Sequence, residues 1–232
     1  MFRKQTVTEF LEALAARTPT PGGGAASALA GAIGVAQASM CAVFTSQNER
    51  YKYVEAEAVR IQARLGEIRT RFLDLMDEDA QAYQGVLAAR RLPKGSAAEK
   101  QARAARLAAA EEEAIRVPEQ ILATAHEALA LTRTLADFCN PNLIADLAVT
   151  AWLLEAAARG AALQVRGNLK GQPGAAGRAG RACETAKACE ESARAIQSRV
   201  LQSMGLPDDC GTAALGCAGT AHRRGRRCHT RK

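Results

Sequence analysis

The sequence predicts an all-α fold, a multihelical up-and-down bundle with one long central helix. Of its 232 residues, 48% are hydrophobic but only 4% are aromatic, and the apolar share is mostly alanine and leucine, which favour closely packed helices. Apolar positions recur at helical intervals in several long segments, whereas strand patterns and internal repeats are not found. This length suits one helical domain, residues 1–204, with a short appendage.

The appendage, residues 205–232, differs in composition from the rest. It holds six Arg or Lys and two Asp, so it carries +4 of the chain's net charge of +7, and it has no apolar period. We predict a basic, disordered tail that does not decide the function. Such charge is enough for non-specific nucleic-acid binding, but the helical part carries only the remaining +3. Nucleic acid is therefore not expected as a partner.

The N-terminal residues predict a short helix. Thr6 and Glu9 have the spacing of a capping box. The helix must end before Pro19, because the residue before a proline disfavours helical geometry. Its predicted apolar face consists of Val7, Phe10, Leu11 and Leu14.

Residues 25–45 predict a second helix that is apolar nearly all round. Its length is sufficient for a membrane span, but Ser27 and Gln37 interrupt it, and alanine and glycine supply little insertion energy. Gly31 and Gly34 would let neighbouring helices approach closely. We interpret it as a buried central helix and predict no membrane association.

The segment from Tyr51 to Arg91 predicts one long packed helix, because its apolar residues recur at intervals of three and four. The next position in the series is Asp79, and apolar residues resume at Tyr83 and Val86. A carboxylate in an apolar stripe is costly unless it is paired, hydrogen-bonded or facing a wet cleft. Asp79 is therefore the candidate functional residue. The stripe consists of Tyr51, Val54, Ala58, Ile61, Leu65, Ile68, Phe72 and Leu75.

The other acidic residues around Asp79 have a simpler explanation. The run "LMDEDAQAY" also contains Asp77 and Glu78, and Asp74 precedes it. Asp74 and Glu78 fall off the stripe, which predicts a solvated acidic face for them.

Three further helices are expected after Pro93. Ser96 and Glu99 repeat the capping-box spacing and begin a helix over 97–138, which Pro118 should kink or break. Lys94 lies in the turn before it. A last amphipathic helix spans 181–203.

The sequence "CNPNLIAD" predicts a turn followed by the fifth helix. Asn140 and Pro141 make the turn, and Asn142 can cap the helix. Asp146 lies one turn inside, where its charge suits the positive end of the helix dipole. Capping explains these residues without any further role. Asn168 lies near the far end of the same helix.

Several kinds of chemistry are not expected. Seven cysteines without a CxxC pair do not indicate a disulfide framework or a zinc site, which favours a cytoplasmic location. No metal-ligand motif and no phosphate-binding loop is present, so neither a metal nor a nucleotide cofactor is predicted. Carboxylates, Asn, Lys and backbone amides remain, which suit hydrolysis of an activated, cationic substrate.

Several separate motifs resemble the cyclodeaminase/cyclohydrolase family of folate enzymes, in the family's order and over residues 6 to 204. They include "FLEALAARTPTPGGGAASALAGAIG", "DLMDEDAQAY", "LPKGSAAEKQAR", "VPEQI" and "NPNLIADLAVTAWLLEAAARGAALQVRGNL". The resemblance implies an all-helical homodimer that acts on one-carbon adducts of tetrahydrofolate and needs no cofactor. Tyr83, Ala25 and Ala145 depart from the residues usual in the family. The Gly-rich stretch after Lys170 is also unusual, and the tail past residue 204 has no counterpart.

The resemblance places the family's catalytic aspartate on Asp79. The implied substrate-binding residues are Gly22, Gly23, Gly24, Lys94, Asn140, Asn142, Asp146 and Asn168. The glycines are expected to let backbone amides approach the folate at a helix start.

The expected reaction is hydrolysis of 5,10-methenyltetrahydrofolate to 10-formyltetrahydrofolate. The alternative within the family is a 5-formiminotetrahydrofolate cyclodeaminase that releases ammonia. A more distant alternative is a non-enzymatic helical adaptor that uses the long apolar stripe as a coiled coil.

Overall fold

A computed structural model describes residues 1–172 and 174–206, so the predicted tail lies almost entirely outside the described residues. Every regular element in the described part is helical, which confirms the all-α prediction. The 3-10 helices are η1 (Phe2–Lys4), η2 (Glu49–Val54) and η3 (Pro141–Leu143). The α-helices are α1 (Val7–Ala15), α2 (Gly23–Ser46), α3 (Glu55–Arg90), α4 (Ala97–Ala136), α5 (Ile144–Asn168) and α6 (Ala175–Ser203).

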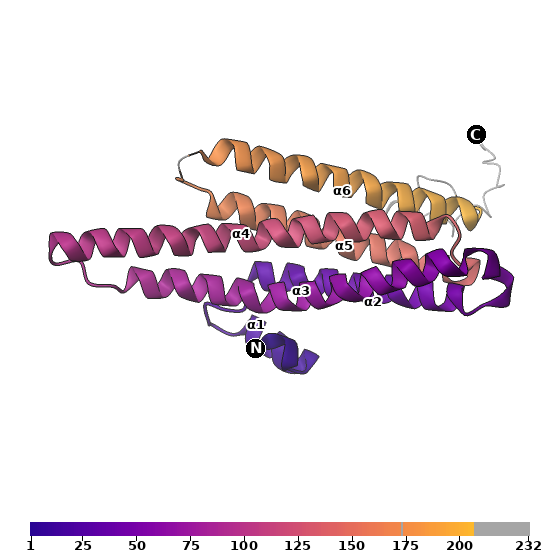
Figure 1. The fold of residues 1–232 in the computed structure, drawn as a ribbon, viewed down its shortest axis with the longest axis horizontal. Helices are drawn as coiled ribbons and strands as arrows, with labels where there is room; N and C mark the ends of the chain where they lie inside the picture. Colours follow the sequence, from indigo (N-terminus) through magenta and orange to yellow (C-terminus); the bar gives the residue numbers. More distant parts are fainter. Residues whose placement is uncertain (173, 207–232) are drawn as a thin grey trace, which may run out of the picture.

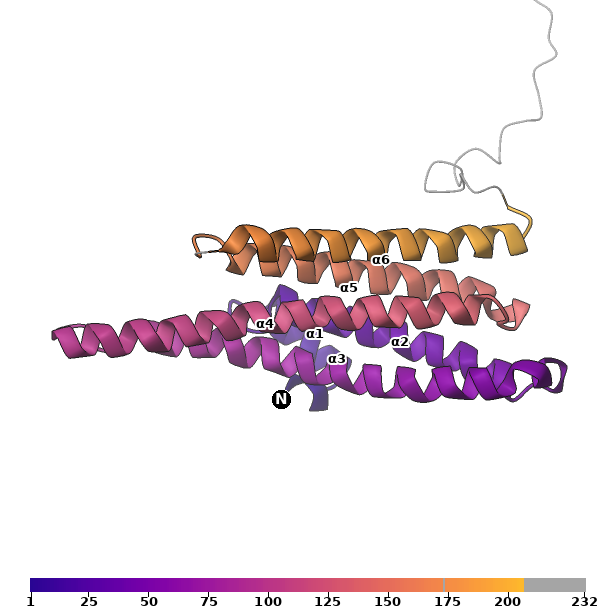
Figure 2. The same cartoon turned by 45° about the horizontal axis from the view of Figure 1, so that its top comes forward.

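Helices α2 to α6 lie side by side along the long axis of the molecule, whereas α1 is set apart from them (Figure 1). Each of these five helices packs against the next along the chain, and α2 also packs against α5. Figure 2 shows α3 and α4 extending beyond the other helices at one end. We call this projection, residues 82–110, the hairpin. It leaves one end of α3 and α4 without a third helix to cover it.

The core confirms most of the apolar stripe of the long helix, since its residues from Ala58 to Leu75 are buried in α3, and so is Val86. The helix begins at Glu55 and not at Tyr51, whereas Tyr51 and Val54 lie in η2 and are half-buried. A Cβ atom on Gly31 would overlap the ring of Phe72, so this glycine lets α2 lie directly on α3. Within the described residues, α2 is the one helix long and apolar enough to cross a membrane, and half of its most apolar window is buried. Its packing against α3 and α5 confirms a central helix, but only its inward side is buried, since Ile33, Met40 and Phe44 are 36% to 57% exposed.

The sequence predicts that Pro118 kinks or breaks the fourth helix, and the break does not occur. Helix α4 runs continuously from Ala97 to Ala136 with Pro118 buried inside it, so the fold has a second long helix beside the predicted central one. Proline removes one backbone hydrogen bond and crowds the preceding turn. Packing of α4 against α3, α5 and α6 compensates for the missing hydrogen bond and keeps the helix continuous at Pro118.

Three smaller predictions are wrong, because each depends on contacts between distant segments that the sequence pattern does not show. The capping box of α1 is confirmed, but Val7 and Leu11 are 70% and 53% exposed because no helix covers them. Tyr83 is 42% exposed, since it lies on α3 beyond the start of α2. Asn142 does not cap the fifth helix; Asn140 accepts from the Asn142 amide at 3.1 Å and caps η3 instead.

Candidate active site

The first turn of α2 lies directly against the carboxyl group of Asp79. The amide nitrogen of Ala25 donates to Asp79 Oδ2 at 3.0 Å. A Cβ atom on Gly24 would overlap the same carboxyl group. Only a hydrogen atom fits between this backbone and the carboxylate, so the contact requires glycine. The pairing joins two motifs that are 54 residues apart in the chain.

The surroundings of Asp79 make its carboxyl group a weaker acid than an ordinary aspartate. Its side chain is half-buried. Burial raises the pKa of the Asp79 carboxyl group, and the hydrogen bond from Ala25 offsets only part of this effect. A raised pKa brings a carboxyl group closer to the range in which it both accepts and releases a proton under physiological conditions. Asp79 is therefore suited to acid–base chemistry.

The same turn of α2 offers unused hydrogen-bond donors. Gly22 is the N-cap, in an extended conformation and without a side chain to accept from the first turn. Among the described residues, no acceptor faces the amide groups of Gly23 and Gly24. Backbone donors at the positive end of a helix dipole bind anions or carbonyl oxygens. This arrangement fits the expected role of the three glycines.

The C-terminal part of α5 reaches the same end of α2. A Cβ atom on Gly23 would overlap the side-chain amide of Gln164. Asn168, one turn further along α5, donates to the carbonyl oxygen of Ala114 at 2.7 Å. The structure therefore places Asn168 on the Asp79 side of the bundle. Sequence reasoning missed Gln164, although its position one turn before Asn168 puts both on one face of the helix.

Asn140, Asn142 and Asp146 lie at the opposite end of α2. Asp146 accepts from the side-chain amide of Gln37 at 2.9 Å, and the Asn140 amide donates to a hydroxyl near the C-terminus of α2. Gln37 follows Gly24 by 13 residues, which is about 20 Å along a helix. Within one chain, the structure does not bring these three residues to Asp79.

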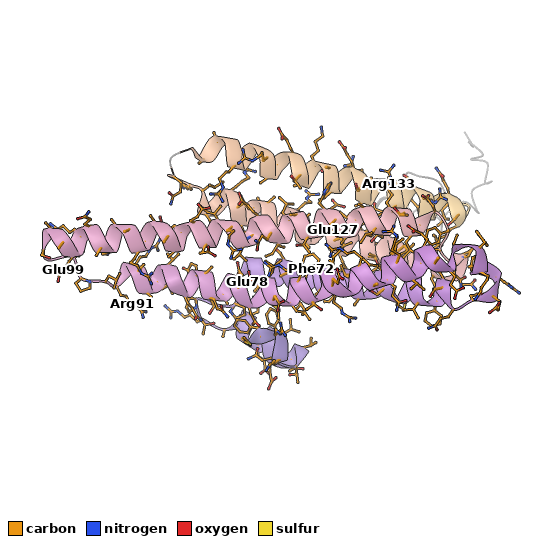
Figure 3. The ribbon with its side chains drawn as sticks, viewed as in Figure 1. Phe72, Glu78, Arg91, Glu99, Glu127 and Arg133 are labelled. Atoms are coloured by element: carbon orange, nitrogen blue, oxygen red, sulfur yellow. The ribbon has the colours of Figure 1, made fainter. Side chains whose placement is uncertain are left out.

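Lys94 is also separate from the carboxyl group. It is exposed in the turn between α3 and α4. Figure 3 shows Arg91 and Glu99, which flank this turn, at the tip of the hairpin and away from Phe72 and Glu78. Arg90 follows Asp79 by eleven residues along the helix, which is about 16 Å.

The neighbouring acidic residues are held by the N-terminal segment and by arginines. Asp74 pairs with Arg3, and Glu78 pairs with Arg71 at 2.5 Å; both side chains remain partly exposed, which confirms the predicted acidic face. Asp77 is buried and accepts from the Phe2 amide at 2.5 Å. No sequence pattern could have shown this contact, because its partner is a backbone group at the start of the chain.

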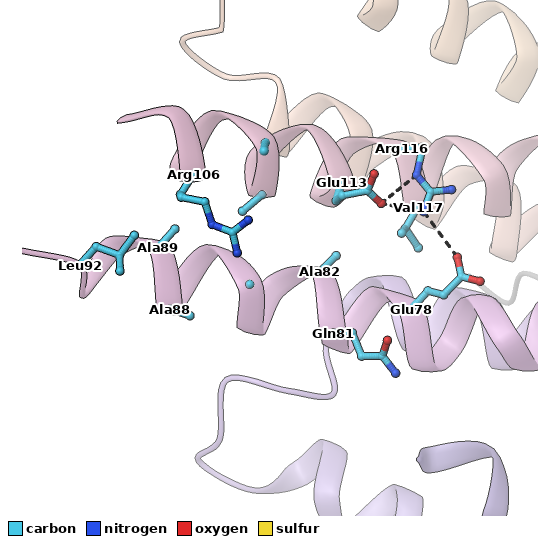
Figure 4. Close-up of a pocket in the computed structure, with 13 residues that line it drawn as sticks. Glu78, Gln81, Ala82, Ala88, Ala89, Leu92, Arg106, Glu113, Arg116 and Val117 are labelled. Atoms are coloured by element: carbon cyan, nitrogen blue, oxygen red, sulfur yellow. Dashed lines mark hydrogen bonds and ion pairs between the residues drawn. The ribbon is translucent and has the colours of Figure 1, made fainter. Parts of the chain in front are cut away.

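A cavity of about 470 Å³ opens between α3 and α4 where the hairpin leaves the bundle. Glu78 lies at one end of it and Leu92 near the other (Figure 4). Arg116 forms ion pairs with Glu113 at 2.7 Å and Glu78 at 3.8 Å at the inner end. Small residues line most of the remainder, so the space stays open.

The described residues contain no group of three or more His, Cys, Asp or Glu side chains placed to hold a metal ion. Their four cysteines are Cys41, Cys139, Cys183 and Cys189, and all four are free thiols.

Comparisons with known proteins agree on one family. The family model described as Formiminotransferase-cyclodeaminase matches residues 6–178. A methenyltetrahydrofolate cyclohydrolase of Methylorubrum extorquens is 35% identical over 171 residues, which are 74% of this chain and 82% of that protein. A formimidoyltransferase-cyclodeaminase of Mus musculus is 30% identical over 161 residues, which are 69% of this chain and 30% of that protein. A crystal structure of formiminotetrahydrofolate cyclodeaminase from Thermotoga maritima matches with a TM-score of 0.73 and 29% identity, covering 88% of this chain and 98% of that one.

Proposed function

Because the chain belongs to the formiminotransferase-cyclodeaminase family, we propose that it is a methenyltetrahydrofolate cyclohydrolase, which hydrolyses 5,10-methenyltetrahydrofolate to 10-formyltetrahydrofolate. The observation that carries the proposal is the half-buried carboxyl group of Asp79, with its raised pKa, against the glycine turn of α2. The similarity to the cyclohydrolase over 82% of that enzyme supports this reaction.

Asp79 is the proposed acid–base group. The methenyl bridge of the substrate is a cation whose carbon accepts water, so a nearby carboxylate stabilises the cation and orients the water. The carboxylate then takes the proton that the water loses as the hydrate forms. In its protonated form it returns that proton to the ring nitrogen that departs, while the hydroxyl group of the hydrate loses its own proton to solvent as the formyl C=O bond forms.

The glycine turn and α5 are proposed to hold the folate ring. The free amide groups of Gly23 and Gly24 can donate to a ring carbonyl oxygen. Gln164, which lies against Gly23, offers both a donor and an acceptor to the same ring. No metal or nucleotide takes part in this proposal; the folate is the substrate, and no cofactor is needed.

The second candidate is 5-formiminotetrahydrofolate cyclodeaminase. The match to the Thermotoga maritima cyclodeaminase, over 98% of that chain, favours it. Asp79 would then protonate the departing ammonia, so the same residue serves either reaction. Decay of the methenyl absorbance and release of ammonia should be measured on the two substrates with one preparation. Turnover of the formimino substrate alone would reverse the order of the two candidates, and folding without any binding of a reduced folate would favour a helical adaptor.

A second copy of this chain is the proposed partner, joined through the outer face of α2 and α5. These two helices run antiparallel, because Gly34 packs on Thr150 and Gly23 on Gln164. Their outward positions carry alanines and large apolar side chains, interrupted on α5 by Arg159 and Arg166. Exposed apolar side chains in such number indicate an interaction site. The large members are Ile33, Met40, Phe44, Val149, Trp152 and Leu163, between 36% and 62% exposed.

Sedimentation measurements on Trp152→Glu test this partner. A charge in the centre of an apolar interface should convert a dimer to a monomer. Arg194→Glu on α6 is the matched control, since Arg194 is an exposed cation outside the outer face of α2 and α5. A wild-type monomer at micromolar concentration would contradict the homodimer.

We also propose a cytoplasmic location for the enzyme, because the four cysteines among the described residues are free thiols.

A further inference from the structure

Two buried cysteines lie next to each other at the C-terminal end of α2. Cys41 belongs to α2 itself, whereas Cys139 follows the end of α4. Their thiol groups share a hydrogen bond, which Cys41 donates to Cys139. Both are free thiols. The fold therefore brings two thiol groups from distant parts of the chain into direct contact.

Thr45, one turn after Cys41 in α2, fixes the two segments relative to each other. Its hydroxyl group donates to the carbonyl oxygen of Cys41 at 2.8 Å and lies 3.7 Å from the sulfur of Cys139. The same hydroxyl oxygen accepts from the Asn140 amide at 3.1 Å. The sulfur of Cys41 also lies 3.9 Å from the carbonyl oxygen of Leu143. Because these contacts join α2 to the turn before α5, the folded chain holds the thiol groups together.

The other two cysteines of the described residues lack such surroundings. Cys189 is buried in α6, and burial raises the pKa of its thiol group to about 11. Cys183 is exposed on the same helix. Among the side-chain hydrogen bonds that join a thiol to another kind of group in the described residues, all belong to Cys41 or Cys139. The paired arrangement is therefore specific to this end of α2.

The two paired thiol groups differ in acidity and in access. The hydrogen bond from Cys41 holds the pKa of the Cys139 thiol below its ordinary value, although burial opposes this effect. The same hydrogen bond, together with burial, raises the pKa of Cys41. Cys139 is 6% exposed, whereas Cys41 is completely buried. Because the thiolate is the reactive form of a cysteine, Cys139 is suited to react first with a small oxidant and Cys41 to react with the product.

We propose that Cys41 and Cys139 form a reversible disulfide when the folded protein meets hydrogen peroxide or another small peroxide. This makes the C-terminal end of α2 a site of oxidative modification. Disulfides of cytosolic proteins are typically transient and redox-sensing. The inference does not depend on the proposed function, because it concerns the thiol groups alone.

The reaction takes place in two steps. The Cys139 thiolate attacks one oxygen of hydrogen peroxide, the O–O bond breaks, and a sulfenic acid and the first water form once a proton is taken up. The Cys41 sulfur then attacks the sulfenic sulfur, and the S–S bond forms while the hydroxyl group leaves with the thiol proton as the second water. The two thiols lose two electrons and two protons in total, and the peroxide is reduced to two waters. A thiol reductant reverses the modification.

Treatment of the reduced full-length chain with hydrogen peroxide tests the site by peptide mapping. The remaining thiols are blocked with N-ethylmaleimide, and the chain is digested with trypsin. The peptides 18–50 and 134–159, which contain Cys41 and Cys139, should appear as one linked species that is lighter than the two reduced peptides by two hydrogen atoms. Dithiothreitol should separate them. Oxidation of other cysteines without this linked species would overturn the proposal, and so would a linked species that forms only in urea.

Single substitutions assign the two steps. Cys41→Ser should stop at the sulfenic acid of Cys139, which dimedone captures, whereas the wild type should lose this label as the disulfide forms. Cys139→Ser should leave Cys41 as a thiol. Cys189→Ser removes another buried thiol and is the matched control, which should form the disulfide as the wild type does. Oxidation of Cys41 at an undiminished rate in Cys139→Ser would overturn the assigned order.

Urea unfolding gives a readout that does not depend on peptides. A disulfide between α2 and the end of α4 closes a long loop, so the oxidised wild type should unfold at a higher urea concentration than the reduced protein. Dithiothreitol should reverse the shift, and Cys41→Ser should not show it. The same shift in Cys41→Ser would assign the stabilisation to another group and overturn the disulfide as its cause. If a variant does not fold by circular dichroism, the linked peptides of the wild type still decide.

Discussion

Each end of α2 lies near a carboxylate, but the polar groups at the two ends differ in how many of them have a hydrogen-bond partner. At the C-terminal end, Gln37 donates to Asp146, and Thr45 both donates to a backbone carbonyl and accepts from the Asn140 amide. At the N-terminal end, Asp79 accepts one amide, and within the described residues those of Gly23 and Gly24 have no acceptor. The C-terminal end is satisfied by its own partners, whereas the N-terminal end still offers donors to a ligand.

This difference indicates where catalysis takes place. A satisfied network stabilises a fold, and Asn140 and Asp146 have such partners within the chain. Open amides beside a carboxyl group of raised pKa cost stability and are typical of a site that binds another molecule. We therefore expect substitutions at the N-terminal end of α2 to lower turnover more than those at the C-terminal end.

The largest effect is expected from Asp79→Asn. The substitution keeps the size and the acceptor for Ala25 but removes the charge and the proton transfer, so turnover should fall about 10²–10⁴-fold. Decay of the methenyl absorbance measures it. Asp74→Asn, which loses only an exposed pair with Arg3, should stay close to wild type. A folded Asp79→Asn protein with near-normal turnover would remove Asp79 from the mechanism and make Asp146 the next carboxylate to test.

A mixing experiment asks whether the two ends of α2 serve one site. If they do, a partner copy must bring them together, because about 20 Å of helix separates them within one chain. Each variant, Asp79→Asn and Asp146→Asn, should then have low activity alone. In an equal mixture about half of the dimers are heterodimers, each with one intact site of two, so the mixture should regain about a quarter of the wild-type activity. If activity does not recover after verified subunit exchange, Asp146 does not contribute to the site of the partner copy and serves only its hydrogen bond with Gln37.

A smaller loss is expected from Gly24→Ala. The added methyl group overlaps the Asp79 carboxyl group, so the side chain must move and the free energy of unfolding should fall by about 1–3 kcal/mol, with an accompanying loss of turnover. Gly66→Ala in α3, where a Cβ atom meets nothing within 4 Å, should gain up to about 1 kcal/mol. Urea unfolding of both variants compares them. Unchanged stability and activity in Gly24→Ala would mean that the first turn of α2 can move away from Asp79 at little cost in free energy.

The sequence predicts those parts of the molecule that depend on local pattern. The apolar stripe of α3 located the buried residues from Ala58 to Leu75, and its interruption identified Asp79, because one helix has a fixed period. The capping boxes of α1 and α4 were likewise correct, since their partners are three residues apart.

The remaining features depend on contacts between distant segments. Asp77 is buried because its partner is the backbone of Phe2, and Gln164 joins the site because α5 returns beside the start of α2. Pro118 stays helical because three neighbouring helices support α4. Val7 stays exposed because no helix covers α1. Each outcome depends on which segment of the chain packs against the residue, and the period of apolar residues carries no information about that segment.

The smallest expected effect concerns stability and pH. Below about pH 3.9, the ordinary pKa of an aspartate, Asp79 is protonated in the folded and the unfolded chain and contributes nothing to the difference between them. As the pH rises past this value, the unfolded chain releases the proton more readily, because burial raises the pKa of Asp79 in the folded state. The folded state therefore loses stability until the pH exceeds that raised pKa.

Asp79→Asn has no such proton to lose, so it should be more stable than wild type at pH 7 and equally stable near pH 3. Urea midpoints of both proteins at the two pH values measure the difference. The same gain at both pH values would come from packing and not from charge. A loss at pH 7 would mean that the hydrogen bond from Ala25 outweighs burial, and the N-terminal end of α2 would then be as well satisfied as the C-terminal end.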